Sequence, residues 1–335
     1  MNKITVSAPG KLLLLGEHAV VYNHPCLVTA VDQRMRATVE LINEPFFELQ
    51  APDVQIADYK KPMSEVGKGD IPKGAKFVEV AVANLLGRSR NKSKIPRGAF
   101  GMTGKKGIKV TTKSEFSSQF GFGSSSASTV CTVKAVSELL DLNLSQKEIF
   151  DLAYKTVLDI QGKGSGFDVA AGIFGGTLYF VTGGKVIQSL NIKSLSLVVG
   201  YSGIKADTVT LINKVKESFA NRQNRLSEIY NGIEILVNEA KGALLKKDWK
   251  KFGEIMNKNQ EYLKELGVSI GKLDLMIKGA LNVGAYGAKL TGAGRGDCMI
   301  ALYSAASKLN IKKAVEKAGG KIIDIKTNAE GVRIE

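Results

Sequence analysis

A glycine- and serine-rich stretch near the middle of the chain has the residue types and spacing to bind phosphate. It reads Gly121-Phe-Gly123-Ser124-Ser125-Ser126 and runs directly into an amphipathic helical pattern. Glycines let a backbone approach a polyphosphate closely, and the free N–H groups at a helix N-terminus attract its charge. The serine hydroxyls can bind phosphate oxygens or Mg²⁺. A flexible linker is the alternative, but the position between a strand pattern and a helix pattern favours a phosphate site.

A second glycine-rich stretch lies far down the chain between two strand patterns. It reads Lys289-Leu-Thr-Gly292-Ala293-Gly294-Arg295-Gly-Asp297-Cys298. By itself it fits a tight hairpin loop as well as it fits a binding loop. The sequence contains neither a Walker GxxxxGK[ST] motif nor a dinucleotide-binding GxGxxG motif, so the common nucleotide sites are excluded.

The chain has few side chains that favour transition metals. His18 and His24 are its only histidines, and Cys26, Cys131 and Cys298 are far apart in apolar stretches. We therefore expect three buried free thiols and no metal centre built from protein ligands.

The formal charge of +15 suggests an acidic partner. Nucleic acid is one candidate, but the basic residues are dispersed and no nucleic-acid motif is present. The densest basic cluster lacks interleaved aromatic residues and reads as a solvated loop; it comprises Arg88, Arg90, Lys92, Lys94 and Arg97. We expect no nucleic-acid partner, and an enzyme that acts on phosphorylated, acidic small molecules.

The elements that must position these residues read as a mixed α+β fold. Strands are predicted at residues 4–6, 12–15, 28–31, 36–42, 108–112, 288–290, 299–303 and 321–325. Helices are predicted at residues 77–86, 127–140, 145–158, 226–244 and 252–263, and residues 53–76 read as an exposed loop. Ser145 and Glu148 fit a capping box at the start of the third helix.

A length of 335 residues suits two domains, and a break near residues 190–196 separates the halves. We place the domains at residues 1–190 and 191–335. No apolar run approaches the ~18 to 20 residues that a membrane span needs, and the N-terminus lacks a signal-peptide pattern. These features predict a cytoplasmic protein with no membrane partner.

The two glycine-rich stretches, together with Ser7-Ala-Pro-Gly-Lys11-Leu-Leu-Leu-Leu-Gly-Glu17-His18, resemble the three motifs of the GHMP kinases. Their order and spacing match along the whole chain. The resemblance implies an N-terminal domain like ribosomal protein S5 domain 2, a ferredoxin-like C-terminal domain, and an active site between them. It implies ATP and Mg²⁺ as cofactors, with Gly121, Gly123, Ser124, Ser125 and Ser126 at the nucleotide phosphates.

The same resemblance assigns roles to single residues. Asp168 matches the family's catalytic aspartate, whose carboxylate can orient an acceptor oxygen and take its proton. Lys11 matches the lysine beside that aspartate, where a cation stabilises charge at the reacting oxygens. Ser125 matches the serine near Mg²⁺. Glu17 and His18 fall at the substrate end of the first motif.

Two acceptors fit the resemblance, phosphomevalonate and mevalonate. Gly-Glu-His-Ala-Val-Val-Tyr22 is similar to mevalonate kinases. Three features favour phosphomevalonate kinase: Val157 stands where mevalonate kinases have a Mg²⁺-binding glutamate, the segment from Gln161 to Ala171 is similar to phosphomevalonate kinases, and Asp297 gives the third motif their ending. We therefore expect phosphomevalonate as the substrate. The acceptor would lie at Lys11, Glu17, His18, Lys163, Ser165, Gly292, Ala293, Gly294 and Arg295.

A relative that has lost catalysis and acts as a ligand sensor is a hypothesis from another class. Such a relative should lack the catalytic pair, whereas Lys11 and Asp168 are both present. For assembly, a monomer and a homodimer both remain open.

Overall fold

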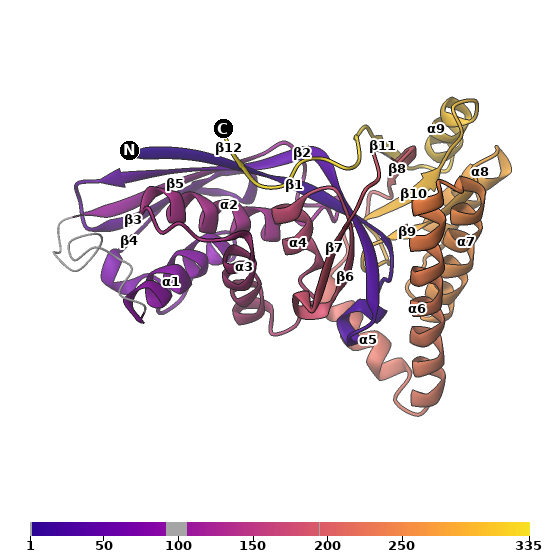
Figure 1. Cartoon of the computed structure of the whole chain (residues 1–335), viewed down its shortest axis with the longest axis horizontal. Coiled ribbons are helices and arrows are strands. Elements are labelled where there is room, and N and C mark those ends of the chain that lie inside the picture. Colours follow the sequence, from indigo (N-terminus) through magenta and orange to yellow (C-terminus); the bar gives the residue numbers. More distant parts are fainter. Residues whose placement is uncertain (1, 92–105, 194) are drawn as a thin grey trace.

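The computed structural model describes residues 2–91, 106–193 and 195–335. Within these residues the strands form two sheets, and each sheet has helices beside it (Figure 1). The expected α+β architecture is thus confirmed. The predicted basic cluster at residues 88–97 begins at the end of the first helix, and residues 92–105 lie outside the described part of the chain.

The first sheet follows the order β12-β1-β2-β5-β3-β4, and β6 joins β2 to β7. Its strands are β1 (Lys3–Leu15), β2 (Pro25–Ile42), β3 (Phe46–Ala51), β4 (Ile56–Pro62), β5 (Gly107–Ser114), β6 (Thr177–Val181), β7 (Val186–Leu190) and β12 (Arg333–Ile334). Helices α1 (Lys76–Asn91), α2 (Ser124–Leu139), α3 (Gln146–Gln161) and α4 (Phe167–Phe174) lie on one face of it (Figure 1). Short 3-10 helices occur at Ala19–Tyr22 (η1), Pro52–Val54, Met63–Glu65 and Thr182–Gly184.

The second sheet has the antiparallel order β11-β8-β10-β9. Its strands are β8 (Leu197–Tyr201), β9 (Gly287–Thr291), β10 (Cys298–Leu302) and β11 (Lys321–Ile323). Helices α5 (Thr208–Ser218), α6 (Gln223–Lys246), α7 (Trp249–Glu265), α8 (Gly271–Asn282) and α9 (Lys308–Lys317) belong to this half. Helix α6 also packs on β2 and η1, and β9 packs on β1, so the two halves are in contact.

Most predicted elements are confirmed, some with different limits. The predicted strands at 28–31 and 36–42 are parts of the one long strand β2. The capping box at the start of α3 is present, because the Ser145 side chain and the Glu148 side chain each bond to the other's backbone N–H. Cys26, Cys131 and Cys298 are buried free thiols, as predicted.

One prediction of the secondary structure is wrong, and several elements were not predicted, α4 among them. The region 53–76, predicted as a loop, contains β4, which pairs with β3. Helix α4 was not predicted, although it carries Asp168 at its second position. Among the described residues no helix is long and apolar enough to cross a membrane.

The chain returns to its first sheet after finishing the second. Residues 324–335, here called the return segment, leave β11 and cross to β1, where Arg333 and Ile334 form β12. Isolated bridges join Val31 to Thr327 and Gly175 to Glu330 along the way. The domain limits at residues 190 and 191 stay a prediction, and the return segment contacts both halves.

Candidate active site

Lys11, Asp168 and the glycine–serine loop come together at one point. Lys11 lies on β1, and its Nζ donates to the carbonyl of Gly121 at 2.8 Å. A Cβ atom at Gly123 would lie 3.2 Å from Lys11 Cε and 3.5 Å from Asp168 Cβ. The structure therefore brings the first motif, the second motif and the predicted catalytic aspartate into van der Waals contact.

Helix α2 opens directly onto this point. Gly123 precedes it with φ of 78°, a left-handed conformation that favours glycine. Among the residues that the structure describes, no side chain caps the helix. Its first helical hydrogen bond runs from the N–H of Ala127 to the carbonyl of Gly123. The N–H groups of Ser124, Ser125 and Ser126 precede that bond and have no acceptor within the helix. A loop of this kind can bind anions, and its binding of the nucleotide phosphates stays a prediction.

Asp168 is held by its neighbours at the start of α4. Its Oδ2 accepts a hydrogen bond from Ser126 Oγ at 2.6 Å, and its Oδ1 accepts one from the N–H of Val169 at 3.1 Å. The sequence assigned Ser126 to phosphate binding, and the structure shows it orienting the carboxylate. Its neighbour Ser125 is half-buried in the first turn of α2. Among the described hydrogen bonds, none uses the Ser125 hydroxyl, so it is free to bind a ligand.

The electrostatic state of Lys11 follows from its burial. The side chain is 7% exposed, and burial lowers its pKa below the ordinary value of 10.5. The carboxylates of Asp168 and Asp297 oppose this shift in pKa and favour the ammonium form. Lys11 also lies over the ring of Phe167, with Nζ 5.1 Å from the centroid. A buried cation is thus placed beside the carboxylate that faces the loop.

The third motif meets the second through Asp297. A Cβ at Gly121 would lie 2.6 Å from Asp297 Oδ2, so the glycine is needed for this approach. Asp297 Oδ1 accepts a hydrogen bond from the N–H of Ala206 at 2.9 Å, and burial raises the pKa of its carboxyl. Asp297 therefore organises the loop between β8 and α5. Gly292, with φ of 87°, has open space where a Cβ would project.

Glu17 and His18 lie between the two halves. Glu17 is fully buried, and its carboxylate is paired with Lys289 and accepts a hydrogen bond from Asn259 Nδ2 at 3.2 Å. His18 Nε2 is 2.9 Å from the carbonyl of Ala293, which can only accept, so Nε2 carries the proton. Its Nδ1 is buried without a hydrogen-bond partner in the described part of the chain. Burial lowers the pKa of His18 and favours the neutral ring.

The remaining predicted residues lie nearer the surface or support the backbone. Lys163 is exposed, and its Nζ donates to Asn213 of α5 at 2.9 Å. Arg295 points to the carbonyl of Gly267, with Nε 3.1 Å away. Gly294 packs against the backbone of Val268, and the buried Ser165 accepts a hydrogen bond from the N–H of Gly183 through its carbonyl.

Lys289 is a site residue that the sequence analysis did not identify. It is fully buried in β9, where every residue is buried, and it bonds Glu17 and the carbonyl of Leu290. Lysine is almost never fully buried without a partner. A single lysine inside an apolar strand pattern is therefore the sequence feature that could have identified Lys289 as a site residue.

The comparisons with known proteins identify the family of the chain. The model of the GHMP kinase N-terminal domain matches residues 81–176, and the model of the GHMP kinase C-terminal domain matches residues 240–321. The chain belongs to the GHMP kinases, a family of phosphotransferases with this two-domain fold.

One relative and two solved structures are similar to the chain along nearly its whole length. It is 33% identical to the mevalonate kinase of Pyrococcus furiosus, over 99% of this chain and 98% of that protein. It is 27% identical to the crystal structure of the Methanococcus jannaschii mevalonate kinase, with a TM-score of 0.80 and 98% of each chain covered. A Streptococcus pneumoniae phosphomevalonate kinase has a TM-score of 0.78 at 20% identity, over 97% of this chain and 99% of that one, which shows the shared fold alone.

The expectation of phosphomevalonate as the acceptor is wrong. The full-length relatives that overturn it are named mevalonate kinases. The structure explains why two of the three features misled. Asp297 bonds the backbone of Ala206, so it has a structural task here. Val157 is buried inside α3, with its methyl group 3.5 Å from where a Cβ of Gly164 would lie. Both residues thus have contacts within the protein itself.

Proposed function

We propose that this chain transfers the γ-phosphate of ATP to mevalonate and so produces its 5-phosphate. The observation that carries the proposal is the match along 99% of the chain to a mevalonate kinase, combined with the contact between Lys11, Asp168 and the α2 N-terminus. Phosphoryl transfer needs chiefly positioning and neutralisation of charge, and this arrangement offers both.

Each residue of the arrangement has a part in the proposed reaction. The N–H groups of Ser124 to Ser126 would hold the phosphates of ATP. Mg²⁺ is bound in such enzymes through one or two protein groups together with substrate phosphates, and the free Ser125 hydroxyl fits that use. Asp168 would orient the acceptor hydroxyl and take its proton. Lys11 would stabilise the negative charge that develops on the transferred group.

The acceptor is proposed to lie between the first and third motifs. His18 Nδ1 is a buried hydrogen-bond acceptor without a partner in the described residues, so a hydroxyl of the substrate would satisfy it. Gly292 offers open space on the other side. Glu17 is occupied by Lys289, and we propose that it shapes this pocket rather than contacting the substrate.

The test is ATP turnover measured against mevalonate, mevalonate 5-phosphate, homoserine and galactose. We expect mevalonate to give the highest kcat/KM, by at least about a hundredfold, which corresponds to roughly 2.7 kcal/mol of discrimination between transition states. Lys11→Met serves as the inactive control. Turnover of another acceptor at a higher kcat/KM would reject mevalonate while keeping the kinase class.

A further inference from the structure

The geometry points to Arg34 as a positioning residue that holds the strand carrying Lys11 and the helix carrying Asp168 in register, through the return segment. This inference rests on the proposed roles of Lys11 and Asp168 in phosphoryl transfer. Arg34 lies on β2, more than a hundred residues away from Asp168 in the sequence, and belongs to none of the three motifs.

The first contact of Arg34 is with β1. Its Nε donates to Ser7 Oγ at 2.6 Å, and its Nη2 donates to the Ser7 carbonyl at 3.0 Å. Ser7 precedes Lys11 by four residues on the same strand. The strand has a register shift between Pro9 and Gly10, so its pairing with β2 is interrupted between Ser7 and Lys11. The bonds from Arg34 therefore fix β1 directly beside this irregularity.

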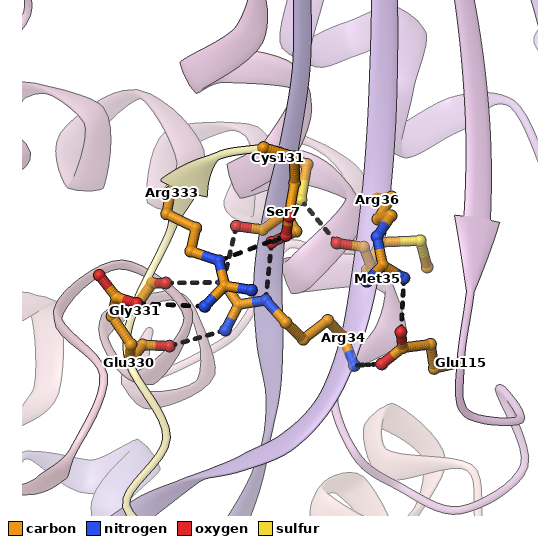
Figure 2. A network of polar contacts seen from close by, with 10 residues as sticks. Ser7, Arg34, Met35, Arg36, Glu115, Cys131, Glu330, Gly331 and Arg333 are labelled. Atoms are coloured by element: carbon orange, nitrogen blue, oxygen red, sulfur yellow. Dashed lines mark hydrogen bonds and ion pairs between the residues drawn. The ribbon is translucent and has the colours of Figure 1, made fainter.

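The second contact is with the return segment. Arg34 Nη1 donates to the Glu330 carbonyl at 2.9 Å, and Nη2 donates to the Gly331 carbonyl at 2.8 Å. Figure 2 shows the guanidinium between Ser7 on one side and Glu330 and Gly331 on the other. The side chain is 5% exposed, and its bond to the Gly331 carbonyl is buried, so loss of that donor would leave a buried carbonyl unpaired.

The return segment in turn supports the end of α4. The N–H of Val332 donates to the Ile173 carbonyl at 3.3 Å, and the N–H of Gly176 donates to the Ala329 carbonyl at 2.7 Å. A Cβ at Gly331 would lie 2.1 Å from the Ile173 carbonyl oxygen, so the two backbones touch. Helix α4 has eight residues, and Asp168 is at its opposite end. A shift of its last turn therefore moves the carboxylate.

Arg34 thus connects Ser7, and through it Lys11, with Ile173, and through it Asp168. Such a connection is valuable because phosphoryl transfer depends on placement: a displacement of about 1 Å can cost about a hundredfold in rate. The nucleotide loop at the start of α2 takes no part in these bonds. Loss of Arg34 should therefore lower kcat and leave the binding of Mg·ATP in place.

The experiment compares the parent with Arg34→Met and with Arg36→Met as the matched control. Arg36 lies two residues along β2 and pairs with Glu115 near the surface, away from the return segment (Figure 2). We expect Arg34→Met to lower kcat about ten- to a hundredfold, with the Kd of Mg·ATP within about twofold of the parent. Arg36→Met should leave both values unchanged, since exposed ion pairs contribute little.

Amide hydrogen exchange gives a second readout that does not depend on the acceptor. In Arg34→Met the amides of residues 169–176 and 327–334 should exchange faster than in the parent, while those of α2 stay protected. Unchanged exchange in α4 together with an unchanged kcat would overturn the inference. If the parent does not turn over mevalonate, the proposed function fails, and the exchange pattern still decides the role of Arg34.

Two more variants cover the case in which Arg34→Met does not fold. Arg34→Lys keeps the charge and the aliphatic part of the side chain. Its ammonium group lacks the planar guanidinium that donates to both Ser7 and the return segment, so we expect an intermediate kcat. Gly331→Ala pushes the return segment off Ile173 and leaves Arg34 intact. The kcat of Gly331→Ala should fall in the same way. The effects of the two substitutions on kcat should be less than additive in the double variant, because both break the same connection. Fully additive effects on kcat would contradict the inference.

Discussion

The orientation of the Asp168 side chain is fixed, because both of its carboxylate oxygens already accept hydrogen bonds. Its Oδ2 bonds the Ser126 hydroxyl and its Oδ1 the N–H of Val169. Asp168→Asn keeps this shape and removes the charge. We expect kcat to fall by about a hundredfold or more, since the proton acceptor is lost, while the Kd of Mg·ATP is unchanged. Measurement of ADP release and calorimetric binding of ATP tests both values.

Ser126→Ala is the matched variant for Asp168→Asn. It removes one hydrogen bond and keeps the carboxylate, so its loss of kcat should be clearly smaller. If Asp168→Asn retained near-parental kcat, the carboxylate would have no part in the chemistry, and Ser126→Ala would then be silent as well.

Lys11 should give the reaction an alkaline limit. Burial lowers the pKa of its ammonium from 10.5, and the nearby carboxylates oppose this. A lowered pKa means that the proton leaves at a lower pH than from free lysine, so kcat should decline before pH reaches 10.5. The pH–rate profile of the parent measures this alkaline decline in kcat. The guanidinium of Lys11→Arg keeps its proton above about pH 12, so the same decline in that variant would mean that another group causes it.

At the scale of the element, the N-terminus of α2 depends on Gly123 having no side chain. Gly123→Ala places a methyl group 3.2 Å from Lys11 and 3.5 Å from Asp168, at a φ of 78°. The left-handed conformation alone costs an L-residue about 1 to 2 kcal/mol. We expect a further loss in the site itself: weaker binding of Mg·ATP and a lower kcat, each by about tenfold or more.

Gly162→Ala is the control for Gly123→Ala. Gly162 has φ of 69° and nothing within 4 Å of its would-be Cβ, so it reports the backbone strain alone. Its free energy of unfolding should fall by a similar amount, with kcat near the parental value. Equal kinetic losses in both variants would show that strain, and not the contact with Lys11 and Asp168, is responsible.

The elements also show what a sequence can and cannot predict. Helix α2 and its glycine–serine entry were predictable because an apolar stripe at helical spacing follows directly. Strand β4 was missed because it is an edge strand whose exposed residues include Lys60, so its alternation is weak. Helix α4 was missed because it has eight residues, is apolar apart from Asp168 and is flanked by glycines. The proposed role of Asp168 came from its motif, whereas the contact of Asp297 with Ala206 depends on tertiary structure.

At the scale of the molecule, the buried pair of Glu17 and Lys289 joins the two halves. Both side chains are fully buried. Lys289→Met leaves the Glu17 carboxylate uncompensated, and we expect a loss of about 3 to 5 kcal/mol in the free energy of unfolding. Urea denaturation measures it. The double variant Glu17→Leu/Lys289→Met has no charge left at either of these two positions, so its free energy of unfolding should exceed that of Lys289→Met. A further decrease in that free energy would mean that the pair itself is strongly stabilising.

The return segment has a consequence for biosynthesis. Ribosomes complete β1 to β7 long before they reach residues 333 and 334, which form the strand that pairs with β1 at the edge of the first sheet. Until then the outer edge of β1 at Val6 and Ser7 lacks this partner, and an open strand edge invites association with other chains. The Arg34 guanidinium likewise cannot form its hydrogen bonds to the Glu330 and Gly331 carbonyls before those residues have been synthesised. The first half of the nascent chain therefore exposes this part of its sheet edge until residues 333 and 334 have been synthesised.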